Sequence, residues 1–279
     1  LPSDLRFSGG AVGFIGYEFI HDVEPVVPRP PQNVLQTPVM YFMIADQLLV
    51  FDRGSQTITL IVNALLEDPT RAGEEYGKAC EVIEGLLKSL AQPCQHHPAD
   101  FHNLSDSAAF ESNMPKDTFL KHVQRSKSYI QAGDIIQVVG SQRFSAPIQA
   151  SPLDVYRAAR SINPSPYMFL LELNGFSLVG ASPEIHVRCE DRQVEIRPIA
   201  GTRPRGKDKV QDIAHEKDLL ADPKERAEHV MLVDLARNDI GRVCDYQSVE
   251  VKDLMIIERY SHVMHIVSQV EGRLSTQHT

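Results

Sequence analysis

The stretch YMFLLELNGFSLVGAS (167–182) constrains the fold more than any other part of the chain. Segments rich in β-branched and aromatic residues flank Asn174-Gly175, and Asn-Gly is a preferred sequence for a two-residue hairpin turn. Such a short turn forces the flanking segments to pair as antiparallel neighbours. A second hairpin is predicted in IHVRCEDRQVEIRPI (185–199), turning near Asp191.

Further strands and helices are interleaved along the chain. Segments with strand-like composition lie at 9–19, 39–53, 57–64, 135–146, 248–256 and 261–274. Helices are predicted from apolar spacing and from start and stop residues at 69–90, 114–133, 151–162, 210–220 and 223–243. Consecutive hairpins separated by helices predict an α+β fold with largely antiparallel sheets and helices packed on them, not a doubly wound parallel sheet.

Three regions are predicted along the sequence. Residues 1–92 form an N-terminal β-rich region, and residues 93–115 form a polar, His-rich linker. Residues 116–279 form the third region, which carries the motifs discussed below.

Composition rules against several classes of protein. A formal net charge of −9, with no basic patch interleaved with aromatic residues, argues against binding to nucleic acid. No apolar run reaches the ~20 residues that span a bilayer, so no membrane association is expected. The four cysteines are widely scattered and have no zinc-site spacing. Reduced thiols are typical of an intracellular protein, so the expected location is the cytoplasm, or a plastid if the source is a plant or alga.

The stretch PKERAEHVMLVDLARNDIGRV (223–243) raises the question of a metal site. Pro223 suits the first turn of a helix, and Glu225 and Glu228, three residues apart, then lie on the same side. Two carboxylates near a helix N-terminus are stabilised by the helix dipole, and they can also bind Mg²⁺. Spacing alone leaves both interpretations open and favours the solvated face.

Six motifs, read together, indicate a family. They occur in the order GDIIQVVGSQRF (133–144), NPSPYMFLLE (163–172), GASPE (180–184), RPIAGTRPRG (197–206), KERAEHVMLVDLARNDIGRV (224–243) and RYSHVMHIVSQVEG (259–272). Over nearly the whole chain, the series closely resembles the chorismate-utilising enzymes, and among them component I of anthranilate synthase. The early GGAVGFIGYEF (9–19) is similar to a strand of the same family.

The resemblance implies an Mg²⁺-dependent lyase of tryptophan biosynthesis that converts chorismate and ammonia into anthranilate and pyruvate. It implies that Glu228 binds Mg²⁺ directly and that Glu225 acts through water. It also implies that His265 is a general acid or assists pyruvate elimination, with the nearby His262 the alternative by sequence alone. Glu184 matches the acid that acts on the 4-hydroxyl of chorismate. Gly201, Thr202 and Gln137 match residues that bind chorismate, and Thr202 is also expected to be catalytic.

Two positions discriminate within the resemblance. Relatives that add water have a lysine base where this chain has Gln137, and an amide cannot serve as that base. Aminodeoxychorismate synthase component I, of folate synthesis, commonly has a lysine where this chain has Ala200, so that nucleophile is absent. That enzyme and a non-catalytic chorismate-binding relative remain the alternatives.

The resemblance also implies an effector and a partner. A tryptophan feedback site is expected at Asn163, Pro164, Ser165, Pro166, Tyr167 and Met168. Ammonia is expected from a glutamine amidotransferase subunit, because the chain has no amidotransferase signature. The family continues beyond the last motif with further substrate and metal residues, so we expect a fragment that lacks both ends and has little activity alone.

Overall fold

The computed structural model describes residues 5–30, 33–93 and 109–278. The chain forms two compact units, one made of residues 1–97 with 189–194 and the other of residues 98–188 with 195–279. Most of the predicted linker 93–115, namely residues 94–108, lies outside the described residues. Within the described ranges, no helix is long and apolar enough to cross a bilayer.

The first unit contains two antiparallel strand pairs and one long helix. Strand β1 (Gly10–Ile15) pairs with β2 (Met40–Ala45), and β3 (Gln47–Asp52) pairs with β4 (Thr57–Val62). The short helices are η1 (Tyr17–Phe19), α1 (Ile20–Val23) and η2 (Pro69–Arg71), and the long helix is α2 (Ala72–Leu90). Helix α2 contacts β4. These elements confirm the β-rich composition and the helix predicted at 69–90.

The second unit begins with two helices and a hairpin. Its first elements are β5 (Glu111–Ser112), α3 (Lys116–Ala132), β6 (Phe144–Ser145), α4 (Pro152–Ile162), β7 (Tyr167–Leu173) and β8 (Phe176–Ser182). Helix α3 ends at Gly133, which has the left-handed φ of 82° that glycine adopts without cost. Helix α4 begins at Ser151, whose Oγ accepts a hydrogen bond from the backbone N–H of Asp154 at 3.1 Å. The helices and the hairpin at Asn174-Gly175 are as predicted.

A five-stranded sheet forms the rest of the strand framework. Its strands are β9 (Arg188–Glu190), β10 (Gln193–Ile196), β11 (Ile199–Pro204), β12 (Glu250–Arg259) and β13 (Val263–Arg273). The order is β11-β13-β10-β9, and β12 also pairs with β13. Asp191 and Arg192 have φ of 47° and 66°, as a tight hairpin turn requires, which confirms the predicted turn. The strand pairs β11–β13 and β12–β13 are both antiparallel, as the sequence predicts.

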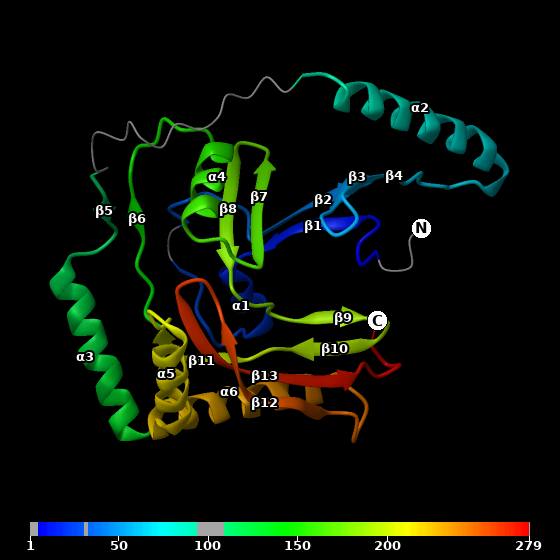
Figure 1. Cartoon of the computed structure of the whole chain (residues 1–279). Helices are drawn as coiled ribbons and strands as arrows, with labels where there is room; N and C mark the ends of the chain where they lie inside the picture. Colours follow the sequence, from blue (N-terminus) through cyan, green and yellow to red (C-terminus); the bar gives the residue numbers. More distant parts are fainter. Residues whose placement is uncertain (1–4, 31–32, 94–108, 279) are drawn as a thin grey trace. The chain divides into compact units, whose positions relative to one another are not determined.

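Helices α5 (Lys209–Ala221) and α6 (Pro223–Gly241) pack on this sheet, mainly against β11 and β13 (Figure 1). Leu219 of α5 and Met264 and Ile266 of β13 are fully buried and form the centre of the core. β13 is the most buried strand because it pairs with neighbours on both edges and carries α6 on one face.

One predicted strand is largely wrong, and two strands were missed. Residues 135–143 form no strand in the described structure, and only Phe144–Ser145 pairs, with β5. The apolar side chains of Ile136 and Val139 are 80% and 86% exposed, so their β-propensity is not matched by a partner strand among the described residues. One missed strand is the short β5, which lies inside the predicted linker. The other is β11, whose glycine and proline concealed it.

We predict that Leu219→Ala lowers the free energy of unfolding by about 2–5 kcal/mol, because it leaves a cavity between α5 and the sheet. Val210→Ala is the matched control, since Val210 lies on the same helix and is 79% exposed. Its effect should stay within about 0.5 kcal/mol. Chemical denaturation of both variants checks this, and equal effects would contradict the proposed core.

Candidate active site

β11 and β13 bring the predicted catalytic histidine to two of the predicted substrate residues. Thr202 lies opposite His265 across the strand pair, and the register shifts between Ala200 and Thr202. The His265 Nδ1 atom is 2.9 Å from the Gly201 carbonyl oxygen and 3.1 Å from Thr202 Oγ1. Because a carbonyl can only accept a hydrogen bond, Nδ1 carries the proton in this arrangement. In the neutral tautomer with this proton on Nδ1, Nε2 is the nitrogen that carries the lone pair.

Gly201 joins this strand pair to helix α6. Its φ is 68°, and a Cβ atom there would lie 3.2 Å from Glu225 Oε2, 3.1 Å from a Leu219 methyl carbon and 3.3 Å from one of Ile266. The backbone conformation thus favours glycine, and any side chain there would also have to displace these three side-chain ends by a few tenths of an ångström. Its carbonyl contacts His265, and the Glu225 carboxylate borders the place where a side chain of this residue would stand.

The N-terminus of α6 sets the direction of the two predicted metal ligands. Asp222 caps the helix, its Oδ1 accepting hydrogen bonds from the backbone N–H groups of Lys224 at 2.9 Å and Glu225 at 3.3 Å. Further along, His229 is fully buried, and its Nε2 lies 2.7 Å from Ser268 Oγ of β13. Burial lowers the pKa of His229, which keeps a charge out of the core. The cap and this contact fix the rotation of α6.

Gln137 meets Glu228 although 91 residues separate them. The Gln137 Nε2 atom donates a hydrogen bond to Glu228 Oε1 at 3.4 Å. Gln137 belongs to the segment 135–143, which forms no strand, so its position comes from the chain path and not from a sheet register. A predicted substrate residue and a predicted metal ligand are therefore neighbours.

Arginine partly neutralises the acidic end of α6. Arg203 of β11 donates hydrogen bonds to Asp218 at 2.6 Å and to Asp222 at 2.9 Å, and its Nη1 lies 3.9 Å from Glu225 Oε1. The Glu225 side chain is only 16% exposed, so this cation offsets part of the cost of burying it. Lys224 Nζ, 3.5 Å from Glu225 Oε1, is a second cation beside this carboxylate.

The donor set fits one side of an Mg²⁺ site. Glu225 and Glu228 supply carboxylate oxygens, which Mg²⁺ prefers, and Mg²⁺ commonly uses only one or two protein carboxylates with several waters and oxygens of the substrate. Among the described residues, no group of three or more His, Cys, Asp or Glu side chains is arranged to hold a metal. The pair could therefore hold Mg²⁺ only together with water, substrate or further ligands.

Glu184 follows strand β8 in a turn in which Ser182 Oγ donates a hydrogen bond to the Glu184 carbonyl oxygen at 2.9 Å. Burial raises the pKa of Glu184, against the opposing influence of His186. A raised pKa suits a carboxyl group that must give up a proton near neutral pH. Glu184 also interacts electrostatically with Tyr260, whose ring packs edge-on against His265 with centroids 5.5 Å apart.

The predicted effector segment borders the same region. A cavity of about 490 Å³ is lined by Ile162, Asn163, Pro164, Ser165, Pro166, Ala181, Pro183, Tyr260, Ser261, His262, Val263 and His265. Tyr167 and Met168 belong to β7 instead and do not line it, and the Tyr167 hydroxyl accepts a hydrogen bond from Arg188 at 3.2 Å. His262 lies in the turn before β13, with Nδ1 2.9 Å from Ser261 Oγ. His265 alone of the two histidines reaches Gly201 and Thr202 among the described contacts.

Sequence reasoning missed three residues around His265. Tyr260, Arg205 and Asp212 form a connected polar network beside it, described below. Arg205 and Tyr260 lie in the motifs RPIAGTRPRG and RYSHVMHIVSQVEG, so their places in the sequence were a signal. Asp212 carried no such signal, because an acid in the first turn of a helix is ordinary.

We predict that Gly201→Ala lowers the free energy of unfolding more than Gly133→Ala does. Both glycines have a positive φ, but no atom of the residues that the structure describes lies within 4 Å of a Cβ placed at Gly133. Gly133→Ala should therefore cost about 1–2 kcal/mol from backbone strain alone. Gly201→Ala should add about 1–3 kcal/mol from overpacking against α5 and α6. Denaturation curves check this, and equal losses would contradict the close approach at Gly201.

We predict that Tyr260 titrates late. Burial and the hydrogen bond that it donates to Glu258 at 2.8 Å raise the pKa of Tyr260 to about 12. This pKa exceeds the value of about 10 for an unfolded chain, so the stabilisation is complete below pH 10 and is lost between pH 10 and 12. Ultraviolet titration of tyrosinate should show this late step. Tyr260→Phe should abolish it, and Glu258→Gln should move it to lower pH, whereas an unchanged curve in both would refute the assignment.

Comparison with known proteins places this geometry in a family. The sequence pattern of the family described as chorismate binding enzyme matches residues 2–279. Anthranilate synthase component 1 of Acetivibrio thermocellus is 44% identical over 100% of this chain and 57% of its own length, and that of Neisseria meningitidis serogroup B is 46% identical over 98% and 55%. The crystal structure of anthranilate synthase component I from Streptococcus pneumoniae superposes with a TM-score of 0.86 at 36% identity, covering 99% of this chain and 60% of that one. This chain thus spans little more than half the length of these relatives. Because the family pattern matches nearly all of it, the chain belongs to the chorismate binding enzymes.

Proposed function

We propose that this chain supplies the chorismate-binding part of an anthranilate synthase component I, acting in tryptophan biosynthesis. The observation that carries the proposal is the position of Gly201, whose carbonyl oxygen contacts His265 Nδ1 and whose vacant side-chain position is bordered by the Glu225 carboxylate. The names of relatives at 44% and 46% identity support the same activity. So does Ala200, which stands where aminodeoxychorismate synthases commonly have a lysine that attacks the ring as a nucleophile.

The proposed reaction has two stages. In the first, the nitrogen of ammonia forms a bond to C2 of chorismate and loses a proton, and the C4–oxygen bond breaks. The leaving hydroxyl takes a proton and departs as water. In the second, C2 loses its proton, and the bond from C3 to the ether oxygen breaks. The enolate that leaves takes up a proton at its methylene carbon to become pyruvate, and the ring is left as aromatic anthranilate. Each stage needs one group that donates or accepts a proton at a defined atom.

Two residues fit the proton transfers. Glu184, whose pKa is raised by burial, is suited to protonate the departing 4-hydroxyl. His265 has its Nδ1 proton committed to the Gly201 carbonyl, so its Nε2 is suited to take the C2 proton during pyruvate elimination. Thr202 Oγ1 shares the Nδ1 proton as an acceptor, and its own hydroxyl proton is free to be donated to substrate.

Mg²⁺, when bound, would supply positive charge for a carboxylate of chorismate. Glu228 would hold it directly and Glu225 through water. Gln137, as a neutral amide next to Glu228, would orient that carboxylate and cannot activate water as a base. These assignments favour ammonia over water as the attacking group.

Two partners accompany the proposal. The name component 1 carried by the relatives implies a second component, and a glutamine amidotransferase subunit that delivers ammonia fits that role. L-tryptophan is proposed as an effector that acts through residues 163–168, of which Asn163–Pro166 line the cavity that His265 also borders.

The proposal predicts the behaviour of Glu228→Gln in the protein made from its complete reading frame. Loss of one carboxylate charge should weaken Mg²⁺ binding, measured by calorimetry with chorismate present, by at least about tenfold. Ammonia-dependent formation of anthranilate, followed by its fluorescence, should fall with it. Asp234→Asn is the control, because Asp234 lies on the same helix, is 64% exposed and pairs only with Arg237 among the described ion pairs.

Product analysis separates the alternatives. Mass spectrometry should find anthranilate and pyruvate from the wild-type protein with chorismate, ammonium and Mg²⁺. An amino product that keeps the enolpyruvyl group would assign the protein to aminodeoxychorismate synthesis instead. Chorismate binding without any product would identify a non-catalytic relative.

A further inference from the structure

The turn between β12 and β13 is held by one arginine. Across residues 260–263, the backbone N–H of Tyr260 donates to the Val263 carbonyl at 2.8 Å. The backbone N–H of Arg205 donates to the His262 carbonyl at 3.0 Å, and the guanidinium Nη1 of Arg205 donates to the Tyr260 carbonyl at 2.6 Å. Arg205 thus donates hydrogen bonds to two carbonyls of the turn, the first with its backbone N–H and the second with its guanidinium group.

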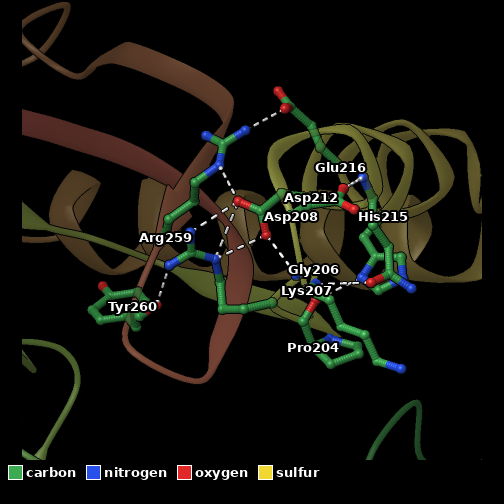
Figure 2. A network of polar contacts seen from close by, with 11 residues as sticks. Pro204, Gly206, Lys207, Asp208, Asp212, His215, Glu216, Arg259 and Tyr260 are labelled. Carbon is green, nitrogen blue, oxygen red and sulfur yellow. Dashed lines mark hydrogen bonds and ion pairs between the residues drawn. The ribbon is translucent and has the colours of Figure 1, made fainter.

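Asp212 of α5 holds that guanidinium in place. The two side chains form a paired contact, with Arg205 Nε 3.0 Å from Asp212 Oδ1 and Nη2 2.9 Å from Oδ2. Asp212 also accepts a hydrogen bond from the Gly206 backbone at 2.7 Å and lies 3.4 Å from Arg259 Nε (Figure 2). Asp212 is only 8% exposed, and these donors hold the pKa of its carboxyl well below the usual range. A planar, two-point pair of this kind fixes direction as well as distance.

Tyr260 connects the turn to His265. Its ring meets the imidazole edge-on, with an interplanar angle of 62°. Both ends of Tyr260 are tied, the carbonyl by Arg205 and the hydroxyl by Glu258, which also pairs with Arg197. The imidazole of His265 therefore has the Gly201 carbonyl and Thr202 at one nitrogen and a fixed aromatic edge against its ring.

We infer that Arg205 is a positioning residue, and that its pair with Asp212 holds His265, through the turn and Tyr260, in the orientation that commits Nδ1 to Gly201 and leaves Nε2 for the substrate. This inference rests on the proposed function for the identity of the substrate only. Small displacements of a proton-transfer group cost large factors in rate, so the pair controls turnover without touching chorismate. The competing account is that the pair only fastens α5 to the sheet.

Two variants test it in the protein made from its complete reading frame. Arg205→Lys keeps the charge but cannot contact Asp212 and the Tyr260 carbonyl together. The double variant Arg205→Met/Asp212→Leu removes both charges of this partly buried pair and should fold, because apolar replacement of both members of such a pair is often neutral for stability. In both, kcat should fall at least about tenfold while KM for chorismate changes less than about threefold. Arg71→Lys, at the exposed Arg71–Glu74 pair, is the matched control and should change neither.

The second readout needs no substrate. In protein labelled with ¹³C-histidine, the Cδ2 chemical shift distinguishes the two neutral imidazole tautomers, and the His265 signal is identified by its loss in His265→Gln. Wild-type His265 should show the Nδ1–H form, and both Arg205 variants should shift toward the Nε2–H form that free histidine prefers.

The two readouts separate failure of this inference from failure of the proposed function. If the wild-type protein makes no anthranilate but the His265 signal shifts in both variants, the proposed function is wrong and the positioning role stands. If the His265 signal and kcat are unchanged in both variants, the pair is purely structural, and the inference is overturned whether or not stability falls.

Discussion

At Gly201 the backbone of β11 takes a positive φ, and its register against β13 shifts. The shift aims the carbonyl oxygen at His265 Nδ1, and the missing side chain lets the strand approach Glu225 and Leu219. The tautomer of His265, the packing of α5 on the sheet and the distance of the acidic helix end from the strand all depend on this position. A residue with a side chain would disturb all three, because crowding and backbone strain act at the same atom.

Strand alternation explains how β11 separates its charges from its candidate catalytic contacts. Successive side chains of a strand point to opposite faces. Arg203, and Arg205 just after the strand, form ion pairs with acids of α5 and of the α5–α6 junction, whereas Thr202, immediately before Arg203, faces His265. The guanidinium groups are thereby held away from His265 Nδ1, while Arg205 still acts on that residue through the backbone of the turn at 260–263.

Local signals were enough for much of the fold. The tight turns at Asn174-Gly175 and Asp191, the Ser151 cap and the Gly133 stop each act over a few residues, so each could be recognised without tertiary information. The strand predicted at 135–146 failed, because apolar composition indicates a strand only where a partner is available, and none lies beside 135–143 in the described residues. β11 was missed for the opposite reason, since its partner β13 compensates for a poor local sequence.

The sequence by itself determined which residues could carry the chemistry, namely two carboxylates one turn apart on a helix, a histidine in a strand motif and a glycine before a threonine. It also determined membership of the chorismate binding enzymes, because long motifs in a constant order survive where local propensity is ambiguous. Only the tertiary structure decided which atoms meet. Gln137 reaches Glu228 across 91 residues, Gly201 faces both His265 and Glu225, and Arg205 reaches the turn that carries Tyr260. Contacts of that sequence separation depend on packing and register, which no local pattern encodes.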